Sequence, residues 1–209
     1  MALSTSALAP HAATDAHAHA RRGISNPILG MILFIASEVM FFAGLFAAYF
    51  NVRFTAAHWP PLVNEAPFEP FQIRNEMVLA AILTAVLVLS SVTMQMAVWA
   101  IRRGDRTAFL RNTGVTLVLG LAFLTGQVYD YLHLGFGITD TAFGSTFYTL
   151  TGFHGAHVLG GTIMLSVVLY RGLAGQFSAR HHDAVEATSL YWHFVDVVWI
   201  VLFSSLYLL

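Results

Sequence analysis

Five long apolar segments dominate the sequence, and arginine, proline or short polar stretches separate them. They cover about residues 28–50, 77–101, 109–134, 143–170 and 184–209. Each is long enough to cross a hydrocarbon core of about 30 Å as a helix, which needs about 20 apolar residues. An open strand in lipid would leave backbone groups unpaired, so strands are excluded for these segments. The pattern therefore predicts an all-α integral membrane bundle of five transmembrane helices.

The rest of the chain divides into a tail and a single bundle. Residues 1–23 consist largely of Ala, Ser, Thr and His without an apolar run, so we expect a disordered cytoplasmic tail and no signal peptide. The domain that follows is expected at residues 24–209. Asn26 is the predicted N-cap of the first helix, with Pro27 at its first helical position.

Composition supports the membrane assignment and excludes several classes of site. Apolar residues make up 57% of the chain and charged residues 10%, against about 45–50% and 25% in soluble domains. The net charge of −1 and the lack of a basic, aromatic-rich surface segment argue against nucleic-acid binding. The chain has no cysteine, which excludes disulfides, thiolate metal sites and iron–sulfur clusters.

The basic residues are all arginines, and their distribution predicts the orientation in the membrane. Two arginines, Arg53 and Arg74, flank the connection between the first and second segments. The other eight fall on the opposite side: Arg21, Arg22, Arg102, Arg103, Arg106, Arg111, Arg171 and Arg180. Because cytoplasmic loops carry the excess of basic residues, the N-terminus is predicted to be cytoplasmic and the C-terminus outside.

Glu38 lies deep in the first apolar segment. It follows Pro27 by 11 residues, or about 16 Å of helix, near the middle of the membrane. An ionised side chain at that depth costs about 2.5–3.5 kcal/mol, so Glu38 is expected to be protonated or paired inside the bundle. One interhelical hydrogen bond contributes only about 0.6 kcal/mol on average. This imbalance favours a functional role for Glu38 over a packing role.

Polar side chains form one stripe on the fifth segment. Glu186, Ser189, His193 and Asp196 have offsets of 0, 3, 7 and 10, which places them on one face of a helix. Such a stripe must face protein in a membrane. The simplest interpretation is a hydrogen-bonded pair of His193 and Asp196 that locks helices together.

Other polar and small residues in the spans are expected to serve packing. His154 and His157 have the i, i+3 spacing of a ligand pair, but two histidines make an incomplete metal site, so no metal is predicted. Gln127 and Asp130 share one face of the third segment. Small residues form a predicted helix-packing ridge at Gly152, Ala156 and Gly160. A mild polar cluster lies in the second segment at Ser90, Ser91, Thr93 and Gln95. It has little diagnostic weight, because Ser and Thr hydroxyls can bond carbonyls of their own helix.

These residues leave three classes of function open. A membrane enzyme or haem carrier would use His154, His157 and His193, and a haem anchor needs axial histidines on two packed helices, such as His154 and His193. A transporter would work around Glu38, although five spans do not divide into two equal repeats. The third class is a non-catalytic subunit of a larger membrane complex.

Three segments resemble subunit III of the haem-copper respiratory oxidases. Residues 37–44 (Ser-Glu-Val-Met-Phe-Phe-Ala-Gly) are similar to the family's helix with a membrane-buried carboxylate. Residues 151–158 (Thr-Gly-Phe-His-Gly-Ala-His-Val) resemble its Gly-Phe-His-Gly-x-His-Val segment, and residues 191–199 (Tyr-Trp-His-Phe-Val-Asp-Val-Val-Trp) resemble its terminal signature. The resemblance extends over essentially everything after the tail. One departure is Asp130, where the family usually has Glu before Tyr, and the chain is similar to the five-helix bacterial form.

The resemblance implies a subunit of a bacterial aa3-type cytochrome c oxidase that holds no redox centre. It implies direct packing against subunit I, whose haems and copper reduce oxygen, and assembly with subunit II in the bacterial inner membrane. Membership of a respiratory supercomplex is compatible with this assembly. Family members support sustained turnover and proton uptake and bind structural phospholipids in a cleft on the oxygen route. A quinol oxidase subunit III and, more remotely, a haem-binding anchor remain alternatives.

Residue roles follow from the resemblance by position. Lipid binding and the oxygen path are expected at Glu38, His157, Arg171 and Glu186. A proton-buffering loop is expected at His181 and His182. An interhelical polar core is expected at His154, His193, Asp196, Gln127 and Asp130. No catalytic residue, metal or cofactor is expected in this chain.

Overall fold

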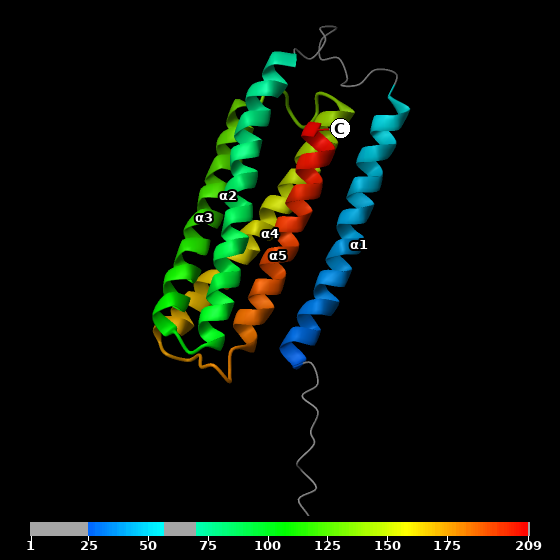
Figure 1. The fold of residues 1–209 in the computed structure, drawn as a ribbon. Helices are drawn as coiled ribbons and strands as arrows, with labels where there is room; N and C mark the ends of the chain where they lie inside the picture. The colour runs from blue at the N-terminus through cyan, green and yellow to red at the C-terminus, as the bar shows by residue number, and fades with distance from the viewer. Residues whose placement is uncertain (1–24, 57–69, 209) are drawn as a thin grey trace, which may run out of the picture.

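The computed structural model describes residues 25–56 and 70–208, with side chains described from residue 77 onward in the second range. Its helices are α1 (Asn26–Thr55), α2 (Pro70–Arg102), α3 (Arg106–His133), α4 (Ala142–Leu173) and α5 (Asp183–Phe203), and a π-helical segment, η1 (Ser204–Leu208), extends α5 (Figure 1). In this part of the chain, five helices are long and apolar enough to cross a membrane. The five predicted spans are therefore confirmed, whereas the predicted tail at residues 1–23 lies outside the described residues.

Helix ends follow local sequence signals. The N-cap of α1 is Ser25, one residue earlier than the predicted Asn26. Asp105 caps α3 and Thr141 caps α4, and each side chain accepts a backbone N–H of the first turn at 2.9 Å. Between α2 and α3 the chain reverses at Gly104, whose φ of 78° favours glycine. This short connection makes α2 and α3 antiparallel neighbours.

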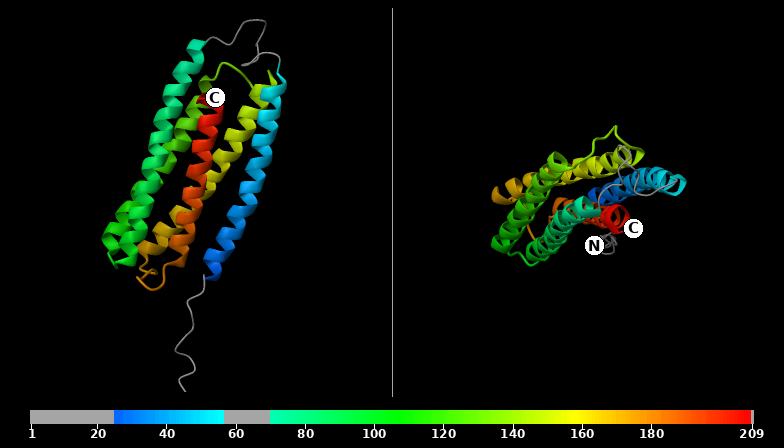
Figure 2. Two further views of the ribbon diagram at one scale, coloured as in Figure 1. Left: turned by 45° about the vertical axis from the view of Figure 1, so that its right-hand side comes forward. Right: turned by 90° about the horizontal axis from the view of Figure 1, so that it is seen from above.

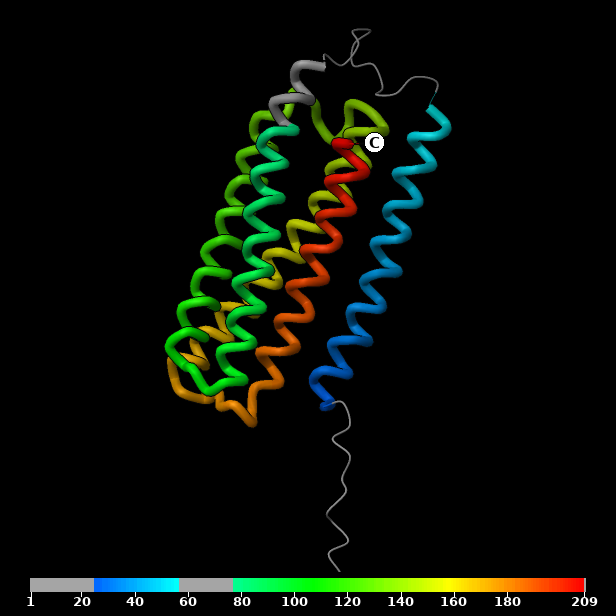
Figure 3. Tube along the Cα trace, in the orientation of Figure 1, coloured from blue at the N-terminus to red at the C-terminus, as the bar shows by residue number. Residues whose placement is uncertain are grey.

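The fifth helix lies at the centre of the bundle. It packs against α1, α2 and α4, and α3 closes the bundle by packing between α2 and α4 (Figures 1 and 2). By contrast, α1 runs along one edge of the bundle (Figure 3). It packs mainly on α4 and α5. In the most apolar stretch of α1 only 6% of the residues are buried, against 56% in that of α5. Most of the α1 surface is therefore available to lipid or to another subunit.

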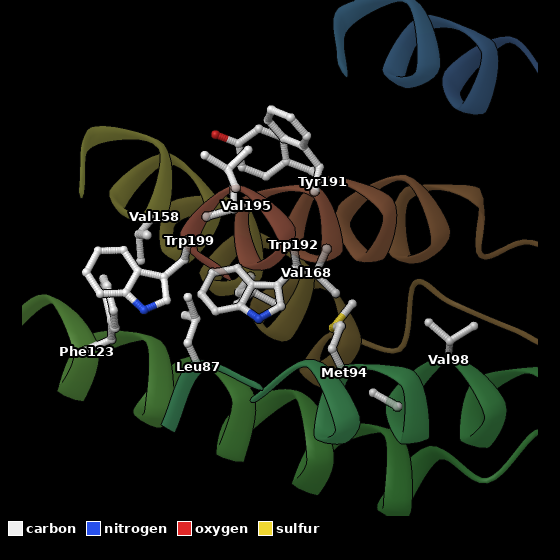
Figure 4. Packing of buried hydrophobic residues seen from close by; sticks show 14 of the residues in the cluster. Leu87, Met94, Val98, Phe123, Val158, Val168, Tyr191, Trp192, Val195 and Trp199 are labelled. Atoms are coloured by element: carbon white, nitrogen blue, oxygen red, sulfur yellow. The ribbon is translucent and has the colours of Figure 1, made fainter. Parts of the chain in front are cut away.

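Trp192 of α5 joins three other helices in the core (Figure 4). Its indole N–H donates to the hydroxyl of Ser90 on α2 at 2.9 Å. A Cβ atom added at Gly120 of α3 would lie 2.6 Å from the indole ring, and one at Gly161 of α4 would lie 2.8 Å from it. The two glycines thus provide the space that lets this large side chain be buried.

The predicted small-residue ridge on α4 is not where the helices come closest. Ala156 is exposed, and a Cβ at Gly152 would lie 3.9 Å from its nearest neighbour, the Tyr131 hydroxyl. At Gly160 an added Cβ would lie 3.3 Å from the Tyr191 hydroxyl. Closer contacts lie outside the ridge, where an added Cβ would be 2.8 Å from Trp192 at Gly161 and 2.7 Å from Phe109 at Gly172. The spacing of small residues gave no indication of which glycine faces the tryptophan.

Candidate functional site

Glu38 of α1 meets His157 of α4 in the middle of the bundle. Glu38 lies 12 residues after the first residue of α1, or about 18 Å along the helix. Its Oε2 atom is 2.9 Å from Nε2 of His157, and the two side chains retain only 19% and 15% exposure. The sequence predicted a neutral or paired carboxyl at Glu38, and the structure provides the pairing partner.

The second ring nitrogen of His157 limits how protons are arranged in this pair. Nδ1 lies 2.7 Å from the carbonyl oxygen of Phe153, and a carbonyl can only accept, so Nδ1 carries a hydrogen. The contact between Nε2 and Glu38 then holds one proton, either on a neutral carboxyl or on an imidazolium. The pair has zero net charge in both cases, which avoids the cost of an isolated carboxylate at this depth.

Aromatic rings surround the pair. The His157 ring lies 5.0 Å from the ring of Phe42 and 6.4 Å from that of Phe41, measured between centroids. On α5, the Tyr191 hydroxyl donates to the His157 carbonyl at 3.0 Å, and its ring stacks with Phe34 of α1 at 6.2 Å. Three helices therefore meet around the pair.

An apolar groove of about 250 Å³ begins beside the pair, between α1 and α5. Phe42 belongs to both features, because its ring contacts His157 and also lines the groove. The other lining residues are Val39, Ala43, Phe46, Phe194, Val197, Val198 and Val201. A groove of this kind accommodates an acyl chain or small apolar molecules next to a carboxyl group.

His193 binds α2, and no direct bond joins it to Asp196 among the described residues. The ring nitrogens of His193 lie 3.1 Å from the Ser91 hydroxyl and 3.3 Å from the Gln95 side-chain oxygen. Asp196 is buried, and its Oδ1 atom has no hydrogen-bond partner within the described part of the chain. Helices α5 and α2 are thus locked through His193. The partners of His193 come from the polar cluster of α2, which had little diagnostic weight in the sequence.

His154 and Gln127 are held by packing. Both are buried, and their side-chain nitrogen and oxygen atoms have no hydrogen-bond partner within the described part of the chain. The His154 ring stacks on Trp199 at 5.0 Å and meets the edge of Phe123 at 5.8 Å. These two members of the expected interhelical polar core are therefore held by packing within the described part of the chain.

The arrangement of the histidines does not suit a haem anchor. Both ring nitrogens of His193 are engaged by α2, and the His154 ring is packed against Trp199 and Phe123. Among residues 25–56 and 70–208, no three His, Asp or Glu side chains converge in a way that could hold a metal ion.

Asp130, the last member of the expected polar core, lies near the end of α3 where this helix meets α4. It is buried there. The neighbouring Tyr131 hydroxyl lies 2.7 Å from the Thr151 hydroxyl of α4. This contact ties the end of α3 to α4, one turn before His154.

Glu186 belongs to a charged cluster at the arginine-rich end of the bundle. Its Oε1 atom accepts from Arg102 of α2 at 2.8 and 2.9 Å and lies 3.1 Å from Nε2 of His182. His181, in contrast, is exposed. From the sequence, Arg102 indicated only the orientation of the chain in the membrane, because the spacing of residues on one helix does not identify a partner on another.

Arg171, near the end of α4, interacts with the connection between α4 and α5. Its Nε donates to the Gln176 side-chain oxygen at 2.9 Å, and its guanidinium lies 4.8 Å from the Phe177 ring centroid. The four residues expected on the lipid and oxygen path therefore occupy two places. Glu38 and His157 are paired in the middle of the bundle, and Arg171 and Glu186 lie at its arginine-rich end.

Comparison with known proteins points to one family. Residues 11–209 match the family described as cytochrome c oxidase subunit III. A probable cytochrome c oxidase subunit 3 of Nocardia farcinica is 41% identical over 98% of both chains. Cytochrome c oxidase subunit 3 of Synechocystis is 41% identical over 94% of this chain and 82% of its own. The corresponding Locusta migratoria protein is 43% identical over 85% of this chain and 67% of its own.

Proposed function

The chain belongs to the cytochrome c oxidase subunit III family, and from this premise we propose that it is the non-redox third subunit of a bacterial aa3-type cytochrome c oxidase. In this role it supports oxygen reduction and proton pumping by subunit I and has no catalytic centre of its own. Cytochrome c is the proposed electron donor of the complex, in keeping with the names of the relatives. The haems and copper belong to partner subunits.

The observation that carries the proposal is the pair of Glu38 and His157 beside the groove of α1 and α5. A pair with zero net charge does not repel apolar molecules, and the groove provides the space for an acyl chain or for oxygen. We assign this region to phospholipid binding and to the oxygen path. Arg171 and Glu186 are assigned to the headgroup region at the arginine-rich end of the bundle.

The proposed partners are subunits I and II of the oxidase in the bacterial inner membrane. Membership of a respiratory supercomplex is compatible with this assembly. Helix α1 suits a docking role because it is the least buried span. The arginine-rich end is assigned to the cytoplasmic side, as is the N-terminus. There, His181 is exposed and serves as the proton-buffering residue, whereas His182 is engaged by Glu186.

The test compares Glu38→Ala with Glu38→Gln in the whole oxidase. The amide of Gln can donate to His157 as a neutral carboxyl would, whereas Ala removes the contact. Both variants are expected to retain the haem spectrum and the initial rate. Glu38→Ala should inactivate several-fold faster during turnover and retain less phospholipid, and Glu38→Gln should stay close to the unmodified enzyme. Unchanged inactivation and lipid content in Glu38→Ala would exclude the proposed role.

A further inference from the structure

A second apolar groove lies on the surface of the bundle between α3 and α4. Its volume is about 680 Å³, and it shares no residue with the groove between α1 and α5. Apart from Arg111 at one end, its lining is entirely apolar: Leu110, Gly114, Val115, Leu117, Val118, Leu119, Leu169 and Leu173. An apolar groove with one cation at its end has the chemistry of a lipid site.

Arg111 is available to a ligand, unlike two of its neighbours. Arg102 is paired with Glu186, and Arg106 donates to backbone carbonyls at the end of α4, at 2.7 Å from the Leu173 oxygen. Arg111 is exposed and forms no hydrogen bond or ion pair with any residue that the structure describes. It lies five residues into α3, about 7.5 Å along the helix, where a long side chain reaches the headgroup layer.

Gly114 leaves the groove open next to Arg111. It lies one turn further along α3, and a Cβ atom added there would meet nothing within 4 Å. From Arg111 to Val118 the groove runs along about 10 Å of helix, enough for the upper part of an acyl chain. The open space therefore continues from the charged end into the depth of the hydrocarbon layer.

We propose that this groove binds one phospholipid with an anionic headgroup. The Arg111 guanidinium donates to the phosphate oxygens, and an acyl chain lies along Gly114 and Val118 between α3 and α4. The site is separate from Arg171, because Leu169 and Leu173 are each two residues from Arg171 and so point about 200° away around α4.

The experiment measures lipid binding to the purified, delipidated oxidase by native mass spectrometry. Dioleoyl phosphatidylglycerol and dioleoyl phosphatidylcholine are the probes. Arg111→Gln is expected to bind phosphatidylglycerol about fivefold more weakly, the effect of about 1 kcal/mol per basic residue. It should bind phosphatidylcholine as before. Gly114→Leu fills the groove and is expected to weaken binding of both lipids.

Two control variants separate the groove from its surroundings. Arg103→Gln removes an exposed charge at the same end of the bundle, and Ala122→Leu enlarges an exposed α3 residue outside the groove. Both should bind the lipids as the unmodified oxidase does. Equal binding by Arg111→Gln and its control Arg103→Gln would overturn the proposal. A second outcome would also overturn it: Gly114→Leu binds lipid as the unmodified oxidase does, but another subunit dissociates from the complex. That result would mean that a helix of the other subunit, and no lipid, occupies the groove.

Discussion

Nε2 of His157 lies 2.9 Å from Oε2 of Glu38, so the only carboxylate of α1 finds its partner 119 positions further along the chain, on α4. The contact matters because α1 is the span with the least buried surface. Near the other end of the helix, the Tyr49 hydroxyl donates to the Ser205 carbonyl at 2.8 Å. Polar contacts therefore join α1 to α4 near its middle and to η1 near its end, in addition to the aromatic packing of Phe42.

Replacing the two members of the pair should have coupled effects. Glu38→Leu and His157→Phe each leave one polar group unpaired, so each is expected to destabilise the subunit. The double variant should be less destabilised than the sum of the two, by about 0.6–1.7 kcal/mol, which are the average and the maximum measured for hydrogen bonds between membrane helices. Thermal dissociation of the subunit from the purified oxidase measures this coupling. Strictly additive effects would show that the two side chains do not interact.

The glycine next to Trp192 should not tolerate a methyl group. In Gly161→Ala the added Cβ would lie 2.8 Å from the indole ring, which is itself held by Ser90. Overpacking of this kind typically costs about 1–3 kcal/mol. Gly155→Ala is the matched control, because a Cβ at Gly155 meets nothing within 4 Å, and Ala is the better helix former. Thermal unfolding should separate the two variants, and equal stability would contradict the packing described here.

His154 and His193 should respond oppositely to replacement by Phe. His154→Phe keeps a ring between Trp199 and Phe123 and removes two nitrogens that have no partner among the described residues. It should therefore leave stability unchanged or raise it. His193→Phe breaks contacts to Ser91 and Gln95 and is expected to cost about 1–2 kcal/mol. Thermal unfolding of both variants, with haem content as a second measurement, checks this. A large loss of stability in His154→Phe would contradict it.

The sequence predicted individual helices well and their mutual contacts poorly. Apolar length alone located the five spans to within a few residues, because lipid permits few alternatives. It also marked Glu38 as costly. The partners of the polar groups depend on how the helices are arranged in space: His157 for Glu38 and Arg102 for Glu186, 119 and 84 positions away. Periodicity on one helix carries no such information.

The orientation of the bundle is open to a direct test, because the chain contains no cysteine. Thr139 is exposed between α3 and α4, and Ser178 is exposed between α4 and α5, at the end that carries Arg102, Arg106 and most other described arginines. If the arginine-rich end is cytoplasmic, a membrane-impermeant maleimide added to spheroplasts should label Thr139→Cys and spare Ser178→Cys.

Permeabilised spheroplasts provide the control, since both variants should then be labelled. Inverted membrane vesicles should reverse the pattern and label only Ser178→Cys. The opposite result in spheroplasts would place the arginines outside. It would also remove Arg111 from the cytoplasmic leaflet, where anionic lipids attract basic side chains close to the membrane surface. The orientation thus bears directly on which leaflet supplies the lipid for the groove between α3 and α4.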